Sequence, residues 1–295
     1  MFAVKRALKL NNNEATLMAR HAEFRRVVFN FGLSLRTQMY SEGKFTDSKV
    51  INEVKKVLTN YVKKKPEFGW MNGLSKCSLV SQTFTISKEG NRWFVSFCVD
   101  VERLPVQQPE SSVGIDVGIK SFATLSKGQV FDAPKPLKQA KTKLATLQRQ
   151  ASKQVKGSRN QRKTYNKISR LHARIARIRL DFLHKLTTYL AKTFKLIKIE
   201  NLNVKGMMAN HKLAGAISDL GFYEFKRQLD YKCRMYGSRL VLVDQWFPST
   251  KTCSNCGTKK DMPLSVRTFD CPACGISLDR DFNASVNILN WEPSA

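Results

Sequence analysis

The fold of this chain is decided by residues 113–131, which read VGIDVGIKSFATLSKGQVF. Apolar residues dominate 113–117 and 122–125, and a Lys-Gly turn precedes a further short run at 129–131. Apolar runs of this length, bounded by Gly and Ser, predict three consecutive short strands. Asp116 lies inside the first run, where an ionised carboxylate needs a partner.

Downstream of this stretch, two further apolar runs predict strands at 196–200 and 240–243. Helical periodicity predicts a helix over 217–236 that ends at Gly237, and a last helix over 283–289. Strands that alternate with helices in this way predict a mixed α/β domain.

The first hundred residues have a different pattern. Alternating residues predict a strand at 3–10 and two strands joined by the turn at 88–91, whereas helical periodicity dominates the segment between them. The strands of the pair are expected at 83–87 and 92–101, the helices at 14–40 and 48–64, and a linker with a domain boundary at 104–112.

The charge is strongly unbalanced: the 295 residues include 51 Lys and Arg against 23 Asp and Glu, which gives a net charge of +28. Nucleic acid is the default partner for such a chain. With 42% apolar residues, general disorder is excluded. The sequence contains neither a long uncharged apolar run nor a signal-peptide pattern, so we expect a cytoplasmic protein without membrane contact.

Basic residues are concentrated between Lys135 and Arg179, where 15 Lys and Arg occur without one acid. Apolar seams predict two antiparallel helical arms here: Leu137, Ala140, Leu144, Leu147 and Ala151 on the first, and Ile168, Leu171, Ile175, Ile178 and Phe182 on the second. A solvated face normally mixes charges, so phosphate contact is the favoured interpretation. The expected nucleic-acid-binding side chains are Lys153, Lys156, Arg159, Arg162, Lys163, Lys167 and Arg170.

Four of the seven cysteines form two pairs, Cys253 with Cys256 and Cys271 with Cys274, and each pair is followed by Gly. Two such knuckles offer four thiolates, which fit one structural zinc ion without an open position for water. The alternative is four ordinary thiols. Buried, apolar roles are expected for the other three, Cys77, Cys98 and Cys233.

Two more acids stand at the edges of predicted elements: Glu200 ends the strand at 196–200, and Asp281 precedes the last helix. Each could simply be a buried carboxylate paired with a basic residue. Together with Asp116 they could instead hold two Mg²⁺ ions, which cleave phosphodiesters by activating water and stabilising the leaving oxygen.

Four segments carry a resemblance: VGIDVGIKSFATLS at 113–126, IENLNVKGM at 199–207, FPSTKTCSNCG at 247–257 and DRDFNASVNI at 279–288. In this order they resemble TnpB, the OrfB-type protein of bacterial insertion sequences and a relative of type V CRISPR effectors. The likeness runs almost continuously from 111 to 290 and is looser before 105. Unlike the usual member, this chain runs almost directly from Leu79 into Thr83, which implies a shortened recognition lobe.

The resemblance implies an RNA-guided DNA endonuclease with an RNase H-like RuvC domain. Asp116, Glu200 and Asp281 would be its catalytic Mg²⁺ ligands, with Mn²⁺ as a substitute, and Asp281 is preferred over Asp279. Arg267 resembles a basic residue near the scissile phosphate, or is a plain surface arginine. The implied domains are a β-barrel wedge (1–12 and 76–108), a recognition lobe (13–75), the nuclease domain (109–246 and 279–295, with the basic hairpin at 135–194) and a zinc ribbon (247–278).

The expected partners are a guide RNA and a target DNA, and both monomer and dimer are open. A second hypothesis is a nucleic-acid-binding protein without cleavage, either a repressor or a transposon remnant, although the complete set of acids favours catalysis. A transposase that joins DNA ends is a third reading, and no tyrosine is marked as its nucleophile.

Overall fold

The computed structural model describes residues 2–9, 11, 84–90, 92–99, 106–263 and 265–292, with short pieces between 18 and 42. Two compact units, residues 1–101 and 102–295, divide the chain. The helix expected at 14–40 is described only in short helical pieces. The helix expected at 48–64, Cys77 and most of the recognition lobe at 13–75 lie outside the described residues.

A three-stranded antiparallel sheet forms the described part of the first unit. It consists of β1 (Phe2–Leu8), β2 (Phe84–Glu89) and β3 (Arg92–Val99) in the order β1-β3-β2. Gly90 turns β2 into β3 with a φ of 60°, as the sequence predicted. Its closure into a barrel stays a prediction, and the side chain of Cys98 lies outside the description.

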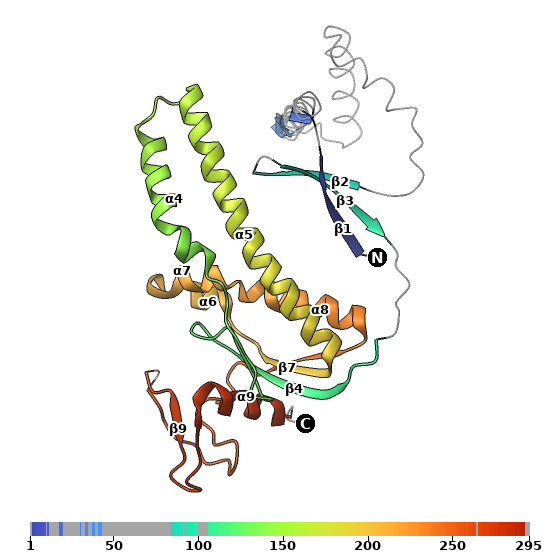
Figure 1. Cartoon of the computed structure of the whole chain (residues 1–295), viewed down its shortest axis with the longest axis vertical. Coiled ribbons are helices and arrows are strands. Elements are labelled where there is room, and N and C mark those ends of the chain that lie inside the picture. Colours follow the sequence, from blue (N-terminus) through green and yellow to red (C-terminus); the bar gives the residue numbers. More distant parts are fainter. Residues whose placement is uncertain are drawn as a thin grey trace. The chain divides into compact units, whose positions relative to one another are not determined.

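A five-stranded sheet organises the second unit, in the order β6-β5-β4-β7-β8, and Figure 1 shows its central strands β4 and β7 side by side. The first three strands run antiparallel, whereas β7 and β8 run parallel to β4. This arrangement confirms the predicted mixed α/β class. The strands are β4 (Glu110–Val117), β5 (Ala123–Leu125), β6 (Val130–Phe131), β7 (Phe194–Glu200) and β8 (Arg239–Val243). A linker was expected over 104–112, but β4 already begins at Glu110, so the linker ends earlier than expected.

Two long helices cover one face of this sheet: α5 (Arg159–Thr193) and α8 (Phe222–Tyr236) (Figure 1). Alternate residues of the central strands point into this core, where Val113, Ile115 and Ile197 are fully buried. Each buried aliphatic side chain of this size contributes about 1.5–3 kcal/mol. Cys233 of α8 is part of the same core, as predicted.

The last helix, α9 (Arg280–Asn290), lies against the opposite face of the sheet (Figure 1). Gly114 makes this close approach possible, because a Cβ built there would lie only 2.2 Å from the carbonyl oxygen of Ser285 and 2.4 Å from the amide nitrogen of Leu289. A glycine in the middle of β4 is therefore required by the helix above it.

The basic hairpin consists of α4 (Pro136–Lys153) and the first half of α5. Leu144, Ala151 and Ile168 are buried between the two helices, which confirms the seam in this part. Ile178, predicted to continue it, is 36% exposed. That prediction was wrong because α5 is much longer than α4, and its second half packs on the sheet and α8 instead.

The single helix expected at 217–236 is in fact two helices, α7 (His211–Leu220) and α8, which follow a short α6 (Val204–Met208) that the sequence did not predict. Gly221 breaks the helix with a φ of 74°. Just before the break, the buried Asp219 accepts hydrogen bonds of 3.0 Å from the backbone nitrogens of Leu137 and Lys138 at the start of α4. The break thus lets α7 turn toward α4.

A small two-stranded ribbon separates β8 from α9. Its strands are β9 (Thr268–Asp270) and β10 (Ser277–Asp279), and they pair antiparallel. Among the described residues, no helix combines the length and apolar character needed to cross a bilayer.

Candidate active site and metal centre

The three acids singled out by the sequence come from three different elements at one edge of the five-stranded sheet. Asp116 lies near the end of β4, Glu200 is the last residue of β7, and Asp281 lies in the first turn of α9. Gly114 of β4 pairs with Lys198 of β7, so Asp116 and Glu200, two residues further on, share the face that α9 covers. The topology therefore brings all three acids to one side of the sheet.

Asp116 is strongly affected by its burial and by the two nearby acids. Its side chain is buried, and burial raises its pKa well above the ordinary value, with the nearby charges of Glu200 and Asp281 raising it further. Arg280 acts in the opposite direction and does not cancel the shift. Carboxylates that repel one another in a buried site are stabilised by a shared cation.

The other two acids are each held by a neighbouring side chain. The Ser249 hydroxyl donates a short hydrogen bond to Glu200 Oε1, which lowers a pKa that burial otherwise raises. Arg280 Nη2 lies 3.4 Å from Asp281 Oδ1, and Arg280 Nη1 donates to the carbonyl oxygen of Val266 at 3.0 Å. Ser249, which precedes α9, thus orients Glu200, and Arg280, the first residue of α9, orients Asp281.

Asp279 and Asp281 have different positions. Asp279 Oδ1 caps α9, because it accepts hydrogen bonds from the backbone nitrogens of Asp281 at 2.9 Å and Phe282 at 3.0 Å. The sequence placed Asp281 just before the helix, and this was wrong: the helix begins at Arg280, with Asp281 in its first turn. The boundary was missed because Asp279, not a later residue, is the cap.

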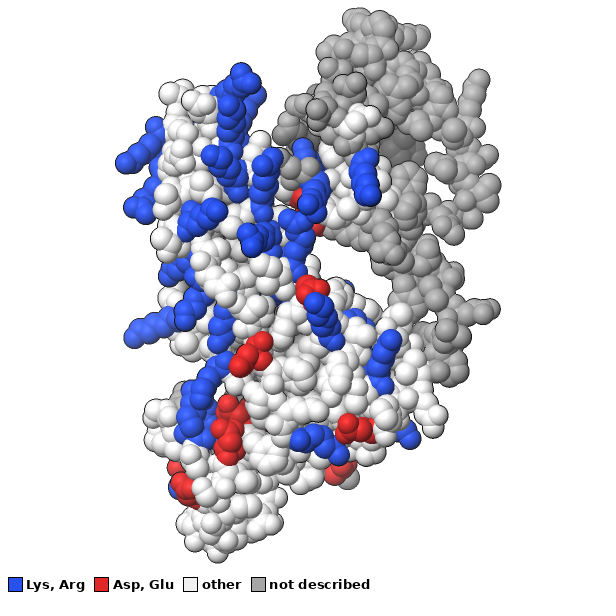
Figure 2. Space-filling view, viewed as in Figure 1, with Lys and Arg blue, Asp and Glu red and all other residues white. Residues whose placement is uncertain are grey.

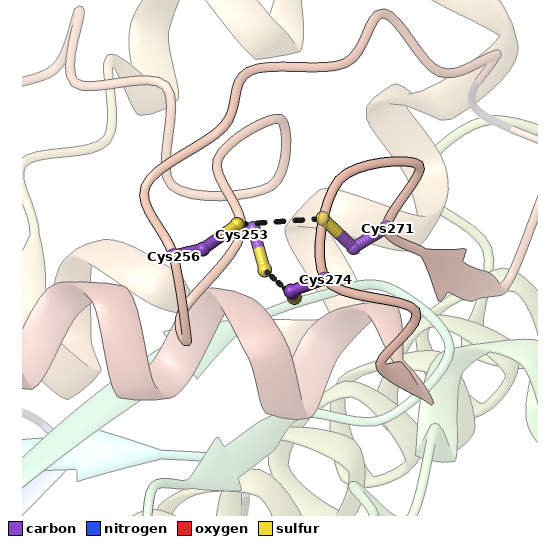
Figure 3. Close-up of side chains that lie close together, drawn as sticks. All are labelled: Cys253, Cys256, Cys271 and Cys274. Carbon is purple, nitrogen blue, oxygen red and sulfur yellow. Dashed lines mark hydrogen bonds between the residues drawn. The ribbon is translucent and has the colours of Figure 1, made fainter.

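The four cysteines gather as predicted (Figure 3). The sulfur atoms of Cys253 and Cys274 are 3.7 Å apart, those of Cys256 and Cys271 are 3.5 Å apart, and all four lie within 4.8 Å of one another. Sulfurs about 2.3 Å from a tetrahedral zinc ion stand about 3.8 Å apart, so the cluster fits such an ion. In the described ranges no second group of acids, histidines or cysteines has its ligand atoms this close together, and the three acids, although on one side of the sheet, are farther apart than the cysteine sulfurs.

The thiols of the cluster differ in acidity. The hydroxyl of Thr258 lowers the pKa of the exposed Cys256 to about 6, and Asn255 lowers that of Cys274. Burial instead raises the pKa of Cys253 to about 11. The two exposed thiols are thus the ones most readily present as thiolates, the form that binds a metal.

The ribbon is fastened to α9 by two buried amides that the sequence analysis did not single out. Asn283 donates to the carbonyl oxygen of Thr252 at 2.7 Å and accepts from the backbone nitrogen of Ser254 at 2.9 Å. Asn287, one turn later, donates to the carbonyl oxygens of Ser249 at 2.7 Å and Thr252 at 2.6 Å. Two Asn four residues apart on the buried face of a helix were the available signal. The segment 249–254, which includes Cys253 of the cluster, therefore contacts Glu200 through Ser249 and α9 through its backbone.

Basic side chains cover the hairpin of α4 and α5 (Figure 2). All seven residues predicted to bind nucleic acid there are exposed: Lys153, Lys156, Arg159, Arg162, Lys163, Lys167 and Arg170. A hollow of about 470 Å³ between the two helices is lined by four cations, Lys143, Lys167, Arg170 and Arg174, with Leu147 and Leu171. Arg267 is exposed on the ribbon, and its carbonyl oxygen accepts a hydrogen bond of 2.7 Å from the backbone nitrogen of Arg280.

Three family models match consecutive parts of this chain. Residues 96–211 match the OrfB model of IS605-type elements, described as "Probable transposase". Residues 222–288 match "Cas12f1-like, TNB domain", and residues 1–44 match the helix-turn-helix domain of the same OrfB proteins. This chain is similar to the OrfB and TnpB-like proteins. The resemblance seen in the sequence is thereby confirmed.

Two curated relatives show the extent of the likeness. A "Putative RNA-guided DNA endonuclease" of Streptomyces pristinaespiralis is 44% identical over 209 residues, which cover 70% of this chain and 52% of that protein. InsQ of Escherichia coli K12, with the same description, is 37% identical over 243 residues, or 76% of this chain and 60% of that protein. The chain thus spans between about half and 60% of the length of these relatives.

Among solved structures, the Cas12f1–sgRNA–target DNA complex matches with a TM-score of 0.46 and 19% identity. The match covers 70% of this chain and 55% of that one.

Proposed function

We propose that this chain is an RNA-guided DNA endonuclease and that Asp116, Glu200 and Asp281 form its catalytic centre. The observation that carries the proposal is the buried Asp116, whose pKa is raised by burial and by the two other acids. A structural carboxylate of this kind would be neutralised by a paired cation, whereas the charges of Glu200 and Asp281 raise the pKa of Asp116 further, and the nearby cation Arg280 pairs with Asp281. The names of the curated relatives support the same activity.

The three carboxylates suit hard divalent cations, Mg²⁺ first and Mn²⁺ as a substitute, because such ions prefer oxygen ligands. A pair of these ions, once bound, supplies water activation and stabilisation of the leaving oxygen in phosphodiester cleavage. The chain's own residues orient the acids: Ser249 holds Glu200, and Arg280 holds Asp281. Asp279 is occupied as the helix cap and is not assigned a catalytic role.

One structural zinc ion is proposed at Cys253, Cys256, Cys271 and Cys274. Four thiolates leave no position open for a reacting water, so the role of the ion is to hold the ribbon. Through Asn283 and Asn287 the ribbon in turn fixes α9. Arg267 is proposed to approach the nucleic acid at this end, because its backbone contacts the start of α9.

The proposed partners are a guide RNA and a target DNA, as expected for a cytoplasmic enzyme with access to the nucleoid. The uniformly basic hairpin would contact their phosphates, and base pairing would select the target. The domain limits stay as predicted from the sequence, from the wedge at 1–12 and 76–108 to the ribbon at 247–278. Gln108, the last residue of the predicted wedge, belongs to the second unit, where it donates a 2.7 Å hydrogen bond to the carbonyl oxygen of Tyr236.

Sequencing the RNA that co-purifies with the protein tests this function. A guided nuclease should carry one defined RNA species whose constant part is followed by a variable end. Random cellular fragments would instead support the second candidate function, a nucleic-acid-binding protein that lacks guided cleavage.

The basic hairpin gives a further prediction. Replacing Arg159, Arg162 and Lys163 by Ala should weaken RNA binding and lower the salt dependence of log K by roughly one unit per lost phosphate contact. Salt titrations of RNA affinity measure both effects.

The matched control for this triple removes three cations that already face a carboxylate: Lys127, Lys185 and Arg234. It lowers the net charge by the same amount and should leave the salt slope nearly unchanged. An equal loss of affinity in both triples would mean that general charge, not the hairpin, binds the RNA.

A further inference from the structure

A cavity of about 410 Å³ opens at the carboxyl end of β7, beside Glu200. Its floor is apolar and includes Ile199, Leu202, Phe222 and Phe225. Phe222 and Phe225 are buried members of the core, so the apolar lining is continuous with the core. The volume lies within the range of pockets that hold small ligands, about 300–1,000 Å³.

The rim of the cavity has an aromatic side and a basic side. Tyr223, the second residue of α8, is 69% exposed and lines the opening. The charged lining residues are Glu200, Lys205, Lys226, Arg227 and Asp230. An exposed ring next to several cations is the combination with which proteins bind single-stranded nucleic acid.

Most of these charges already have partners inside the protein. Arg227 forms two 2.7 Å hydrogen bonds with Glu224, Lys226 Nζ lies 2.8 Å from Asn201 Oδ1, and Asp230 pairs with Arg234. Lys205 is exposed on α6 and makes no ion pair with any carboxylate in the described part of the chain. Among the same residues Lys226 also lacks a carboxylate partner, but it is half-buried and already engaged by Asn201, so Lys205 is the exposed cation of the lining that is open to an external phosphate.

We propose that this cavity binds one nucleotide of single-stranded DNA, with its base against Tyr223 and the apolar floor and its phosphate at Lys205. The inference rests on the proposed function, because Glu200 of the proposed catalytic centre lines the same cavity. A base inside a duplex is stacked on its neighbours and cannot lie against a protein ring, so the ligand is a single strand. Stacking accepts any base, and the site is accordingly independent of sequence.

The test is the affinity of the full chain, without Mg²⁺ and in EDTA, for a labelled oligothymidylate of about eight nucleotides, a typical site size. Tyr223→Ala should weaken binding about fivefold or more, whereas Tyr223→Phe, which keeps the ring, should stay within about twofold of the wild type. Tyr189→Ala, another exposed tyrosine (36%) that lies outside the basic hairpin, is the control and should have the smaller effect. Lys205→Ala should lower the salt slope by about 0.7.

Equal affinities of the wild type and Tyr223→Ala, or an equal loss in Tyr189→Ala, would overturn the proposal. Thermal melting verifies that the variants fold, as expected for so exposed a side chain. The two proposals fail separately. A wild type that never cleaves DNA but loses single-strand affinity in Tyr223→Ala refutes the nuclease and keeps the cavity. A wild type that cleaves with a guide while Tyr223→Ala binds normally refutes the cavity alone.

Discussion

Replacing Asp116, Glu200 or Asp281 by Ala should lower Mg²⁺-dependent DNA cleavage by at least about 10²–10³-fold, the usual cost of losing charge stabilisation at a reacting phosphate or carbonyl. Affinity for RNA should stay nearly intact, because phosphate contacts on the basic hairpin provide most of it. Cleavage time courses and binding titrations on the same protein preparations measure both quantities. Cutting at a near-normal rate in any one variant would refute the assignment of that acid.

The neighbouring acid Asp279 offers a sharp control. Asn caps helices about as well as Asp, so Asp279→Asn should keep α9 in place and leave cleavage close to that of the wild type. Asp281→Asn changes the same atoms two residues later and should abolish cleavage. The opposite pattern would show that Asp279 is the catalytic acid.

The centre formed by Asp116, Glu200 and Asp281 should destabilise the folded protein at neutral pH when no metal is bound. Because the pKa of Asp116 is higher in the folded chain than in the unfolded one, its ionisation costs folding energy. The cost is absent below the unfolded pKa and grows as the pH rises toward and through the folded pKa. Asp116→Asn should therefore raise the unfolding midpoint at pH 7, and this gain should disappear in acid. A lowered midpoint at pH 7 would contradict the repulsion inferred among the acids.

Loss of the cysteine cluster is expected to have the second largest effect. Cys253→Ser and Cys271→Ser should lose zinc, unfold the ribbon and release Asn283 and Asn287 from their backbone partners. With α9 no longer fixed, Asp281 is misplaced, and cleavage should fall roughly ten- to a hundredfold, as for residues that position a metal site. Elemental analysis and cleavage assays measure the two consequences.

Cys233 supplies the control for this prediction. It is buried in the main core, away from the cluster, so Cys233→Ala should keep the zinc ion at a modest cost in stability. Wild-type protein without zinc, or Cys271→Ser protein with full zinc content, would refute the structural metal site.

Much of the second unit could be predicted because its signals are local. The strand runs around Asp116 and Glu200, the paired cysteines and the basic hairpin all depend on residues close in sequence, and the structure contains these elements. The likeness of the motif order to TnpB then suggested that distant acids belong together. Periodicity alone would not have joined Asp116 to Asp281.

The features that were missed depend on partners far along the chain. The side chain of Asp219 binds the start of α4, which is far away in sequence. Because this contact favours a helix end near Asp219, the periodicity of 217–236 alone does not predict the break at Gly221. The exposure of Ile178 follows from where α4 begins, at Pro136, and the need for Gly114 follows from how closely α9 approaches. Ser249 and Asn287 looked like ordinary polar residues because their partners, Glu200 and the ribbon backbone, meet only in the folded chain.

The most direct test of the account is cleavage with two guide RNAs that differ only in their variable ends, each offered both matching DNA targets in Mg²⁺. The account predicts that the cut moves with the guide and that Asp116→Ala cuts neither target while binding both guides. Cutting that ignores the guide, or wild-type protein that cuts neither matched target in Mg²⁺ or Mn²⁺, would contradict an RNA-guided nuclease.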